Sequence, residues 1–262
     1  MSDFLNMILL AIIQGLTEFL PVSSSGHLVL TQHFLGALEG DIFFDIVLHV
    51  GTLGSVMVVY RKELLRLLRF DKPALGYILS LILGTLPAVL VGLLAKNYIE
   101  NLFHSPLFAA GGLIVTALVL FSTKFSRDAG QTLAEPWEPS VVPPAKAVII
   151  GLAQSIAILP GISRSGTTIA TSLWIGLPRA EAARFSFLLS IPAIGGALLL
   201  QLLDGGLGQR SDIGLLVLSA LAAFGVGLLA IRWTALAVVQ SHFWKFSIYC
   251  VVAGLVAFAI LR

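Results

Sequence analysis

The sequence has very few charged residues for its length. Of its 262 residues, 11% are Asp, Glu, Lys or Arg, whereas 57% are apolar. A soluble domain carries about 25% charged residues, so this composition excludes an ordinary soluble fold. The formal net charge is only +2, and without a basic surplus we expect no nucleic-acid partner.

Cysteine is nearly absent as well. Cys250 is the single one, which excludes an internal disulfide and a thiolate metal cluster. A basic segment before the first apolar run is also missing, since Met1, Ser2 and Asp3 precede that run. We therefore expect no cleaved signal peptide.

Long apolar runs, in contrast, are abundant. They are long enough to cross a bilayer core of about 30 Å, and they are continuous rather than alternating, which favours membrane helices over a barrel. The pattern predicts an all-α polytopic membrane protein with six full transmembrane helices. The predicted spans are residues 42–60, 75–95, 106–123, 182–203, 213–232 and 244–261.

Two further apolar regions, 4–36 and 146–176, are interrupted halfway by polar residues, in the segments LPVSSSG (20–26) and LPGISRSG (159–166). Proline ends or kinks a helix, and serine favours helix N-caps. Each region therefore predicts two half-helices joined by a polar loop. We interpret both as re-entrant hairpins; the alternative is a pair of full crossings joined by an ordinary surface turn.

The two interrupted regions resemble each other. Gln14 precedes Gly26 by twelve residues, and Gln154 precedes Gly166 by twelve. FFDIVLHVGTLG (43–54) also matches RFSFLLSIPAIG (184–195) at nearly the same offset. The sequence predicts two repeats, 1–125 and 146–262, joined by a cytoplasmic linker at 126–145. Because each repeat has three full crossings, the second is inserted upside down, and broken helices of inverted repeats meet near the midplane.

Positive charge predicts the orientation in the membrane. With the basic segment 61–72 in the cytoplasm, twelve of the sixteen Lys and Arg residues lie on the cytoplasmic side and three lie outside. Both termini are then external, so the first hairpin enters from outside and the second from the cytoplasm. The sixteenth cation, Arg164, lies at the tip of the second hairpin.

Charged residues at membrane depth are costly, and they usually face a cavity, pair with each other or mark a functional site. Glu18 belongs to the first hairpin and Arg164 to the second, so the two share one site if the tips meet. The polar residues expected there are Gln14, Glu18, Ser23, Ser24, Ser25, His27, Ser163, Arg164, Ser165, Thr167 and Thr168.

The segment GISRSGTT (161–168) has the chemistry of an anion site. Gly161 and Gly166 allow close backbone approach, the following half-helix offers free N–H groups at its N-terminus, and arginine binds phosphate with two parallel hydrogen bonds. The sequence therefore predicts a phosphate or pyrophosphate site. The alternatives are close helix packing for the serines and a purely structural Glu18–Arg164 ion pair.

Asp45 and His49, spaced four residues apart on one predicted helix face, form a second polar pair. We interpret them as structural or as a support for the site.

QGLTEFLPVSSSGHL (14–28) together with LPGISRSGTT (159–168) resembles the undecaprenyl-pyrophosphate phosphatase family of the BacA type. The resemblance implies a multi-pass enzyme of the bacterial inner membrane. Its substrate is the C55 isoprenyl pyrophosphate carrier lipid, whose monophosphate is recycled for peptidoglycan synthesis, and its activity confers bacitracin resistance. The family pattern has Glu or Gln, then three residues, then Glu, and here these are Gln14 and Glu18. Gln14 cannot act as a base, so any acid–base role at this pair falls on Glu18.

The resemblance also implies a divalent cation, Mg2+ or Ca2+, for which Glu18 is the candidate ligand. The expected catalytic residues are Glu18, Ser24, His27 and Arg164. The expected substrate-binding residues are Gln14, Ser23, Ser25, Gly161, Ser163, Ser165, Gly166, Thr167 and Thr168.

Ser24 is the preferred nucleophile, with Glu18 or His27 accepting its proton; a phosphohistidine at His27 is the rival mechanism. We expect the site to open to the periplasmic side. The sequence is also compatible with a homodimer. The alternative function is transport of the carrier lipid phosphate, because inverted repeats are also a transporter architecture.

Overall fold

The computed structural model describes residues 3–38, 41–126, 139, 142–203 and 212–262. Within these residues the chain forms twelve α-helices and two short 3-10 helices, and no strand. The α-helices are α1 (Asp3–Phe19), α2 (Ser24–Leu35), α3 (Ile42–Val59), α4 (Arg61–Leu67), α5 (Lys72–Leu94), α6 (Lys96–Phe103), α7 (Pro106–Ser122), α8 (Pro144–Ile156), α9 (Arg164–Trp174), α10 (Arg179–Leu203), α11 (Ile213–Val239) and α12 (Phe246–Leu261). The 3-10 helices are η1 (Thr123–Phe125) and η2 (Phe243–Lys245).

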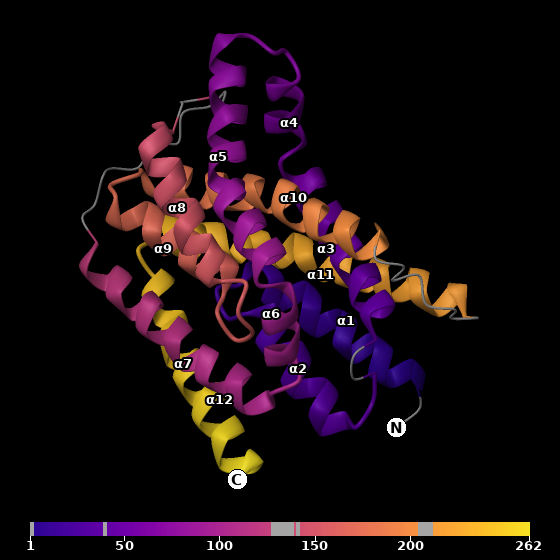
Figure 1. Ribbon diagram of the computed structural model, residues 1–262. Coiled ribbons are helices and arrows are strands. Elements are labelled where there is room, and N and C mark those ends of the chain that lie inside the picture. The colour runs from indigo at the N-terminus through magenta and orange to yellow at the C-terminus, as the bar shows by residue number, and fades with distance from the viewer. Residues whose placement is uncertain (1–2, 39–40, 127–138, 140–141, 204–211) are drawn as a thin grey trace.

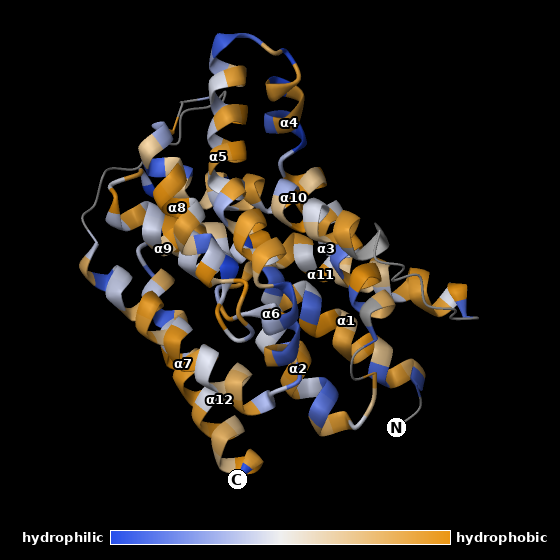
Figure 2. Ribbon diagram, in the orientation of Figure 1, coloured by the Kyte–Doolittle hydropathy of each residue, from blue (hydrophilic) through white to orange (hydrophobic). Residues whose placement is uncertain are grey.

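Five of the described helices, α5, α7, α10, α11 and α12, are long and apolar enough to cross a membrane. The number becomes six if α3 and α4, which meet at a bend of 75°, count as one span. Figure 2 shows hydrophobic residues along most of α5, α7 and α12, and hydrophilic ones at the turn between α4 and α5. The molecule is thus an all-helical polytopic membrane protein.

The predicted spans lie on α3, α5, α7, α10, α11 and α12, with α11 continuing from the predicted end at 232 to Val239. Two helices were not predicted, α4 and α6. Both are short and follow directly on a longer helix, and the lysine or arginine at the start of each interrupts the apolar run that predicts a span. The predicted linker 126–145 lies mostly outside the described residues.

Both interrupted regions form a helix, a polar turn and a second helix, as predicted. The turns are capped in the same way: Ser23 Oγ accepts a hydrogen bond from Gly26 N at 3.2 Å, and Ser163 Oγ accepts one from Gly166 N at 3.0 Å. In each turn the capping hydroxyl also lies 3.3 Å from a second serine hydroxyl, that of Ser25 or Ser165. Each serine cap satisfies one of the free N–H groups at a helix start.

Each interrupted region packs on a helix from the other half of the chain. α1 lies along α11, and α8 lies along α5. These helices approach closely because they meet through glycine: a Cβ at Gly15 would lie 2.7 Å from Ala223 O, and one at Gly151 would lie 2.7 Å from Gly84 O. Small residues are the usual means of close helix contact in membranes. The two halves are therefore interlocked rather than laid side by side (Figure 1).

The two turns touch at their tips. A Cβ at Gly26 would lie 2.8 Å from the Cα of Gly161, and Ser165 Oγ donates a hydrogen bond to Leu20 O at 3.3 Å. This contact brings the last turn of α1 and the first turns of α2 and α9 to one place. The structure thus joins the two polar segments that the sequence singles out.

Candidate functional site

Glu18 is the centre of the polar cluster. It lies in the last turn of α1, where Thr234 of α11 donates a hydrogen bond to the carbonyl oxygen of Phe19 at 3.1 Å and holds the helix end. The residue is only 8% exposed. A carboxylate buried to this degree is stabilised only by charged or hydrogen-bonding partners. For Glu18 these partners are Arg164, Ser24 and Gln14.

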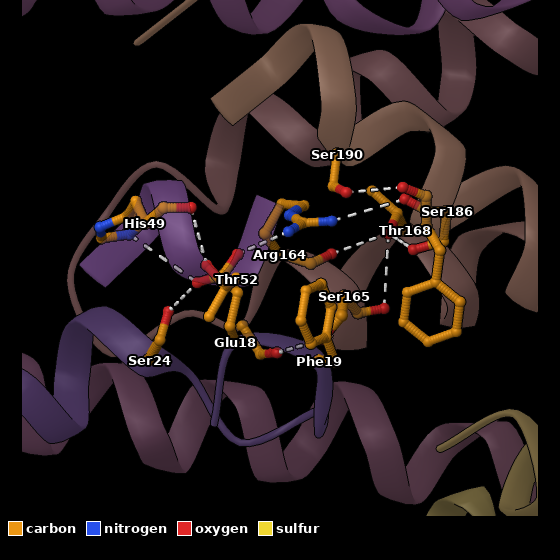
Figure 3. A network of polar contacts seen from close by, with 12 residues as sticks. Glu18, Phe19, Ser24, His49, Thr52, Arg164, Ser165, Thr168, Ser186 and Ser190 are labelled. Carbon is orange, nitrogen blue, oxygen red and sulfur yellow. Dashed lines mark hydrogen bonds and ion pairs between the residues drawn. The ribbon is translucent and has the colours of Figure 1, made fainter. Parts of the chain in front are cut away.

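Arg164 provides the opposite charge. It is the first residue of α9, and its Nη2 lies 2.6 Å from Glu18 Oε1, a hydrogen-bonded ion pair between the two halves of the chain (Figure 3). Nη1 lies 3.4 Å from the Ser186 carbonyl oxygen of α10. The guanidinium therefore links α1 to α10. The backbone of Arg164 lies at the N-terminus of α9, where the macrodipole favours an anion.

Ser24 approaches the other carboxylate oxygen. Its hydroxyl donates to Glu18 Oε2 at 2.6 Å, and Gln14 Nε2 donates to the same oxygen at 3.1 Å. Ser24 is the first residue of α2, and Ser23 before it has a positive φ of 70°. Non-glycine residues rarely adopt this conformation, and such backbone strain is typical of functional sites. The strained turn presents the Ser24 hydroxyl to Glu18.

His49 also reaches this oxygen. Its Nε2 lies 3.8 Å from Glu18 Oε2, on the same side of the carboxylate as Ser24 (Figure 3). Sequence reasoning placed His49 in a pair with Asp45 but did not foresee its contact with Glu18. The four-residue spacing was the available signal; the partner lies on α1, and no local pattern reveals that contact.

His27 points elsewhere. The sequence predicted it beside Glu18 and Ser24, but its Nδ1 lies 2.8 Å from Ser23 O and its Nε2 lies 2.8 Å from the Tyr249 hydroxyl. The ring also stacks on Tyr249, with centroids 5.6 Å apart. Both ring nitrogens are thus engaged by the Ser23 carbonyl and α12, so the structure corrects the expected placement. A catalytic role for His27 stays a prediction.

The hydroxyl groups of the second hairpin brace Arg164. Thr168 Oγ1 donates to the Arg164 carbonyl oxygen at 2.8 Å and lies 2.6 Å from Ser186 Oγ. Ser186 was not predicted, since it lies within an ordinary apolar run. Gln14 Oε1 and Thr167 Oγ1 are buried with no hydrogen-bond partner among the described residues.

Gly161 serves the packing of the turn. Its φ is +88°, and a Cβ there would overlap the Ala109 carbonyl oxygen of α7. Thr116 of α7 donates its hydroxyl to Gly161 O at 2.8 Å and accepts from Ser163 N at 2.9 Å. Ser23, Ser25, Ser163 and Gly166 belong to the two capped turns. Their role in substrate binding stays a prediction.

The residues around Glu18 do not fit a cation held by several protein ligands. Glu18 Oε1 is engaged by a guanidinium, and Oε2 by Ser24 and Gln14. Across the part of the chain that the structure describes, no three His, Cys, Asp or Glu side chains converge as a metal site. The expected Mg2+ or Ca2+ stays a prediction.

The chain is similar to known proteins over nearly its whole length. The family model described as bacitracin resistance protein BacA matches residues 7–256. The undecaprenyl-diphosphatase of Desulfosudis oleivorans is 43% identical over 266 residues, covering 94% of each chain. Those of Rhodopirellula baltica and Desulfatibacillum aliphaticivorans are 39% and 38% identical, covering 97% and 96% of each chain. With a family model and relatives that span nearly its whole length, this chain belongs to the BacA family of bacitracin resistance proteins.

Proposed function

We propose that this protein is an integral-membrane phosphatase that hydrolyses undecaprenyl diphosphate to undecaprenyl phosphate and inorganic phosphate. The observation that carries the proposal is the convergence on Glu18 of the Arg164 guanidinium and the Ser24 hydroxyl, from different hairpins. The relatives named above as undecaprenyl-diphosphatases support the choice of substrate. The product is a carrier lipid of peptidoglycan synthesis, and removing the diphosphate form that bacitracin sequesters gives resistance.

Arg164 and the start of α9 bind the diphosphate. A guanidinium matches two phosphate oxygens in one plane, and the free N–H groups of the helix N-terminus add partial positive charge. Thr168 holds the backbone carbonyl of Arg164, and the Ser186 carbonyl holds its side chain. Arg164 is therefore fixed before substrate arrives. Pre-positioned charge of this kind stabilises the transition state of phosphoryl transfer.

Ser24 attacks the terminal phosphorus, and Glu18 accepts the serine proton. The hydrogen bond from Ser24 Oγ to Glu18 Oε2, 2.6 Å long, is the geometry required of a nucleophile and its base. The new Oγ–P bond forms as the anhydride P–O bond breaks, and undecaprenyl phosphate leaves as the anion. Water then attacks the phosphoserine, inorganic phosphate leaves, and Ser24 Oγ recovers its proton from Glu18.

The topology is part of the proposal. Two inverted repeats, 1–125 and 146–262, each contribute one re-entrant hairpin and three spans. α2, α8 and α9 have 12, 13 and 11 residues, so each is about 17–20 Å long at 1.5 Å per residue, too short to cross a core of about 30 Å. The reciprocal packing of α1 on α11 and α8 on α5 supports the repeat.

The site opens to the periplasmic face of the bacterial inner membrane. Toward the start of α3, the polar residues Asp45 and His49 are only partly buried. Toward its end, Tyr60, Phe187 and Phe19 pack with ring centroids 5.9 Å apart and close the other side. The start of α1 and the end of α12 lie at the end of the molecule away from the basic α4–α5 turn (Figure 1), as external termini require. The site forms within one chain, and a homodimer stays a prediction.

The test is phosphate release by purified protein in detergent micelles, which contain no sealed compartment. Wild-type protein should release inorganic phosphate from undecaprenyl diphosphate, and Glu18→Gln, which keeps the shape of the side chain, should release at least about 100-fold less, a typical loss for a general base. If wild-type protein binds the lipid but releases no phosphate, the proposal fails and transport becomes the better function.

A further inference from the structure

His49 occupies a fixed position beside Glu18. Its Nδ1 lies 2.7 Å from the Asp45 carbonyl oxygen one turn earlier in α3. A carbonyl only accepts hydrogen bonds, so Nδ1 carries the proton and Nε2 is turned toward Glu18, 3.8 Å from Oε2. At this distance the contact is too long for a hydrogen bond, and it is an ion pair only when the imidazole is protonated.

The contact closes a circle of polar interactions through three helices. Ser24, at the start of α2, donates to Glu18 of α1. Gln32, two turns further along α2, donates its Nε2 to Asp45 Oδ1 of α3 at 3.1 Å. His49, one turn after Asp45 in α3, contacts Glu18. The position of the Ser24 hydroxyl relative to Glu18 is therefore determined twice, once directly and once through α3.

The carboxylate of Glu18 has partners on opposite sides. Arg164 engages Oε1, whereas Ser24 and His49 lie at Oε2 (Figure 3). Gln14 also donates to Oε2. Rotation of the carboxylate would separate the proton-accepting oxygen from the serine. Arg164 holds only Oε1, so by itself it leaves Oε2 able to swing away from the Ser24 hydroxyl. The His49 imidazole, packed beside Oε2, limits this movement.

We infer that His49 is a positioning residue for phosphoryl transfer, which keeps Glu18 Oε2 turned toward the Ser24 hydroxyl. This inference rests on the proposed phosphatase function. It assigns His49 no contact with the diphosphate, which Arg164 and α9 bind. Loss of His49 therefore affects kcat and leaves KM almost unchanged.

Two amide variants provide a matched test. His49→Gln has an amide long enough to donate to Glu18, whereas His49→Asn carries the same group on a side chain one methylene shorter. We expect His49→Asn to lower kcat by about 10- to 100-fold, the loss that misplacement of a reacting group by about 1 Å produces. His49→Gln should recover most of the wild-type kcat, and KM should stay within about twofold in both variants.

The comparison separates positioning from general structural damage, since both variants introduce the same polar group at the same site. Thermal unfolding in micelles checks that they fold equally well, and His104→Asn, at an exposed histidine after α6, serves as the surface control. The inference is overturned if His49→Asn keeps the wild-type kcat, if Gln and Asn lose activity equally, or if KM rises instead. These results require active wild-type protein; inactive wild-type protein contradicts the proposed function itself.

Discussion

Glu18 and Arg164 are 146 positions apart in the chain, yet their charged atoms lie 2.6 Å apart. Their side chains are only 6% and 15% exposed, so each charge depends on the other for stabilisation. Breaking a buried pair by removing one partner costs about 3–5 kcal/mol, because the remaining charge stays buried and uncompensated. The pair therefore couples the stability of the two chain halves to the chemistry of the site.

A double-mutant cycle measures this coupling. Arg164→Met leaves Glu18 unpaired and should lower the free energy of unfolding by about 3 kcal/mol. The double variant Arg164→Met with Glu18→Gln should be more stable than Arg164→Met alone, because no charge is then left buried. Denaturation in detergent micelles measures all four proteins. Additive losses would show that the two side chains do not depend on each other.

Ser24→Ala and His27→Ala separate the two candidate nucleophiles. Since Ser24 contacts Glu18 and His27 contacts Tyr249, we expect Ser24→Ala to abolish phosphate release in a single turnover. His27→Ala should still release phosphate, at a rate lowered by the loosened start of α2. Acid-quenched samples of wild-type protein with labelled substrate should carry an acid-stable phosphoserine. An acid-labile phosphoenzyme in Ser24→Ala would instead establish His27 as the nucleophile.

The histidines show how far sequence reasoning reaches at this site. The starts of α2 at Ser24 and of α9 at Arg164 follow from the proline and serine residues of the two turns. The direction of the His27 ring could not be predicted, since Tyr249 of α12 binds it from 222 positions away. For the same reason the role of His49 stayed hidden: the Asp45 spacing is local, but the contact with Glu18 depends on how α3 packs beside α1.

Gly161→Ala should destabilise the protein strongly. The residue has a φ of +88°, and an added methyl would overlap the Ala109 carbonyl oxygen. Overpacking of this kind costs about 1–3 kcal/mol, and the left-handed backbone adds about 1–2 kcal/mol. Gly176→Ala is the matched control, because Gly176 has a φ of +75° and a Cβ added there would meet no other part of the molecule within 4 Å. A Tm loss no larger for Gly161→Ala than for Gly176→Ala would contradict the packing described.

Thr116→Val tests how α7 holds the second turn. The hydroxyl bridges Gly161 O and Ser163 N, so the isosteric valine leaves two buried backbone groups unsatisfied, at a cost of about 1–3 kcal/mol. Because Ser163 precedes Arg164, kcat should fall as well. Thr85→Val removes a hydroxyl that bonds the Leu81 carbonyl of its own helix, and it should change stability by less than about 0.5 kcal/mol. Equal effects would rule out the bridge as a support of α9.

Labelling of engineered cysteines tests the orientation of the site. In a Cys250→Ala background, Ser24→Cys should react with a membrane-impermeant thiol reagent added to the outside of intact spheroplasts. Lys96→Cys, exposed at the start of α6, should also react, whereas Lys62→Cys, exposed in α4, should require permeabilisation. Labelling of Ser24→Cys only after permeabilisation would place the opening on the cytoplasmic side.

The helices themselves were largely predictable. Apolar runs located α5, α7, α10 and α12 to within a few residues, since a bilayer fixes their length. The bend of 75° between α3 and α4 was not predictable. Tyr60 and Arg61 interrupt the run without proline or glycine, and the change of direction depends on packing, with the Tyr60 ring held against Phe187 of α10.

The interlocked halves have a consequence for biosynthesis. α1 leaves the ribosome first, but the surface it rests on belongs to α11, and the Thr234 hydroxyl that fixes its end is made more than two hundred residues later. During insertion Glu18 therefore lacks the Arg164 guanidinium until α9 has entered the membrane. α1 lacks the helix on which it packs until α11 follows. A nascent or truncated chain lacks the assembled polar cluster, so under the proposed function hydrolysis begins only when nearly the entire polypeptide has been inserted.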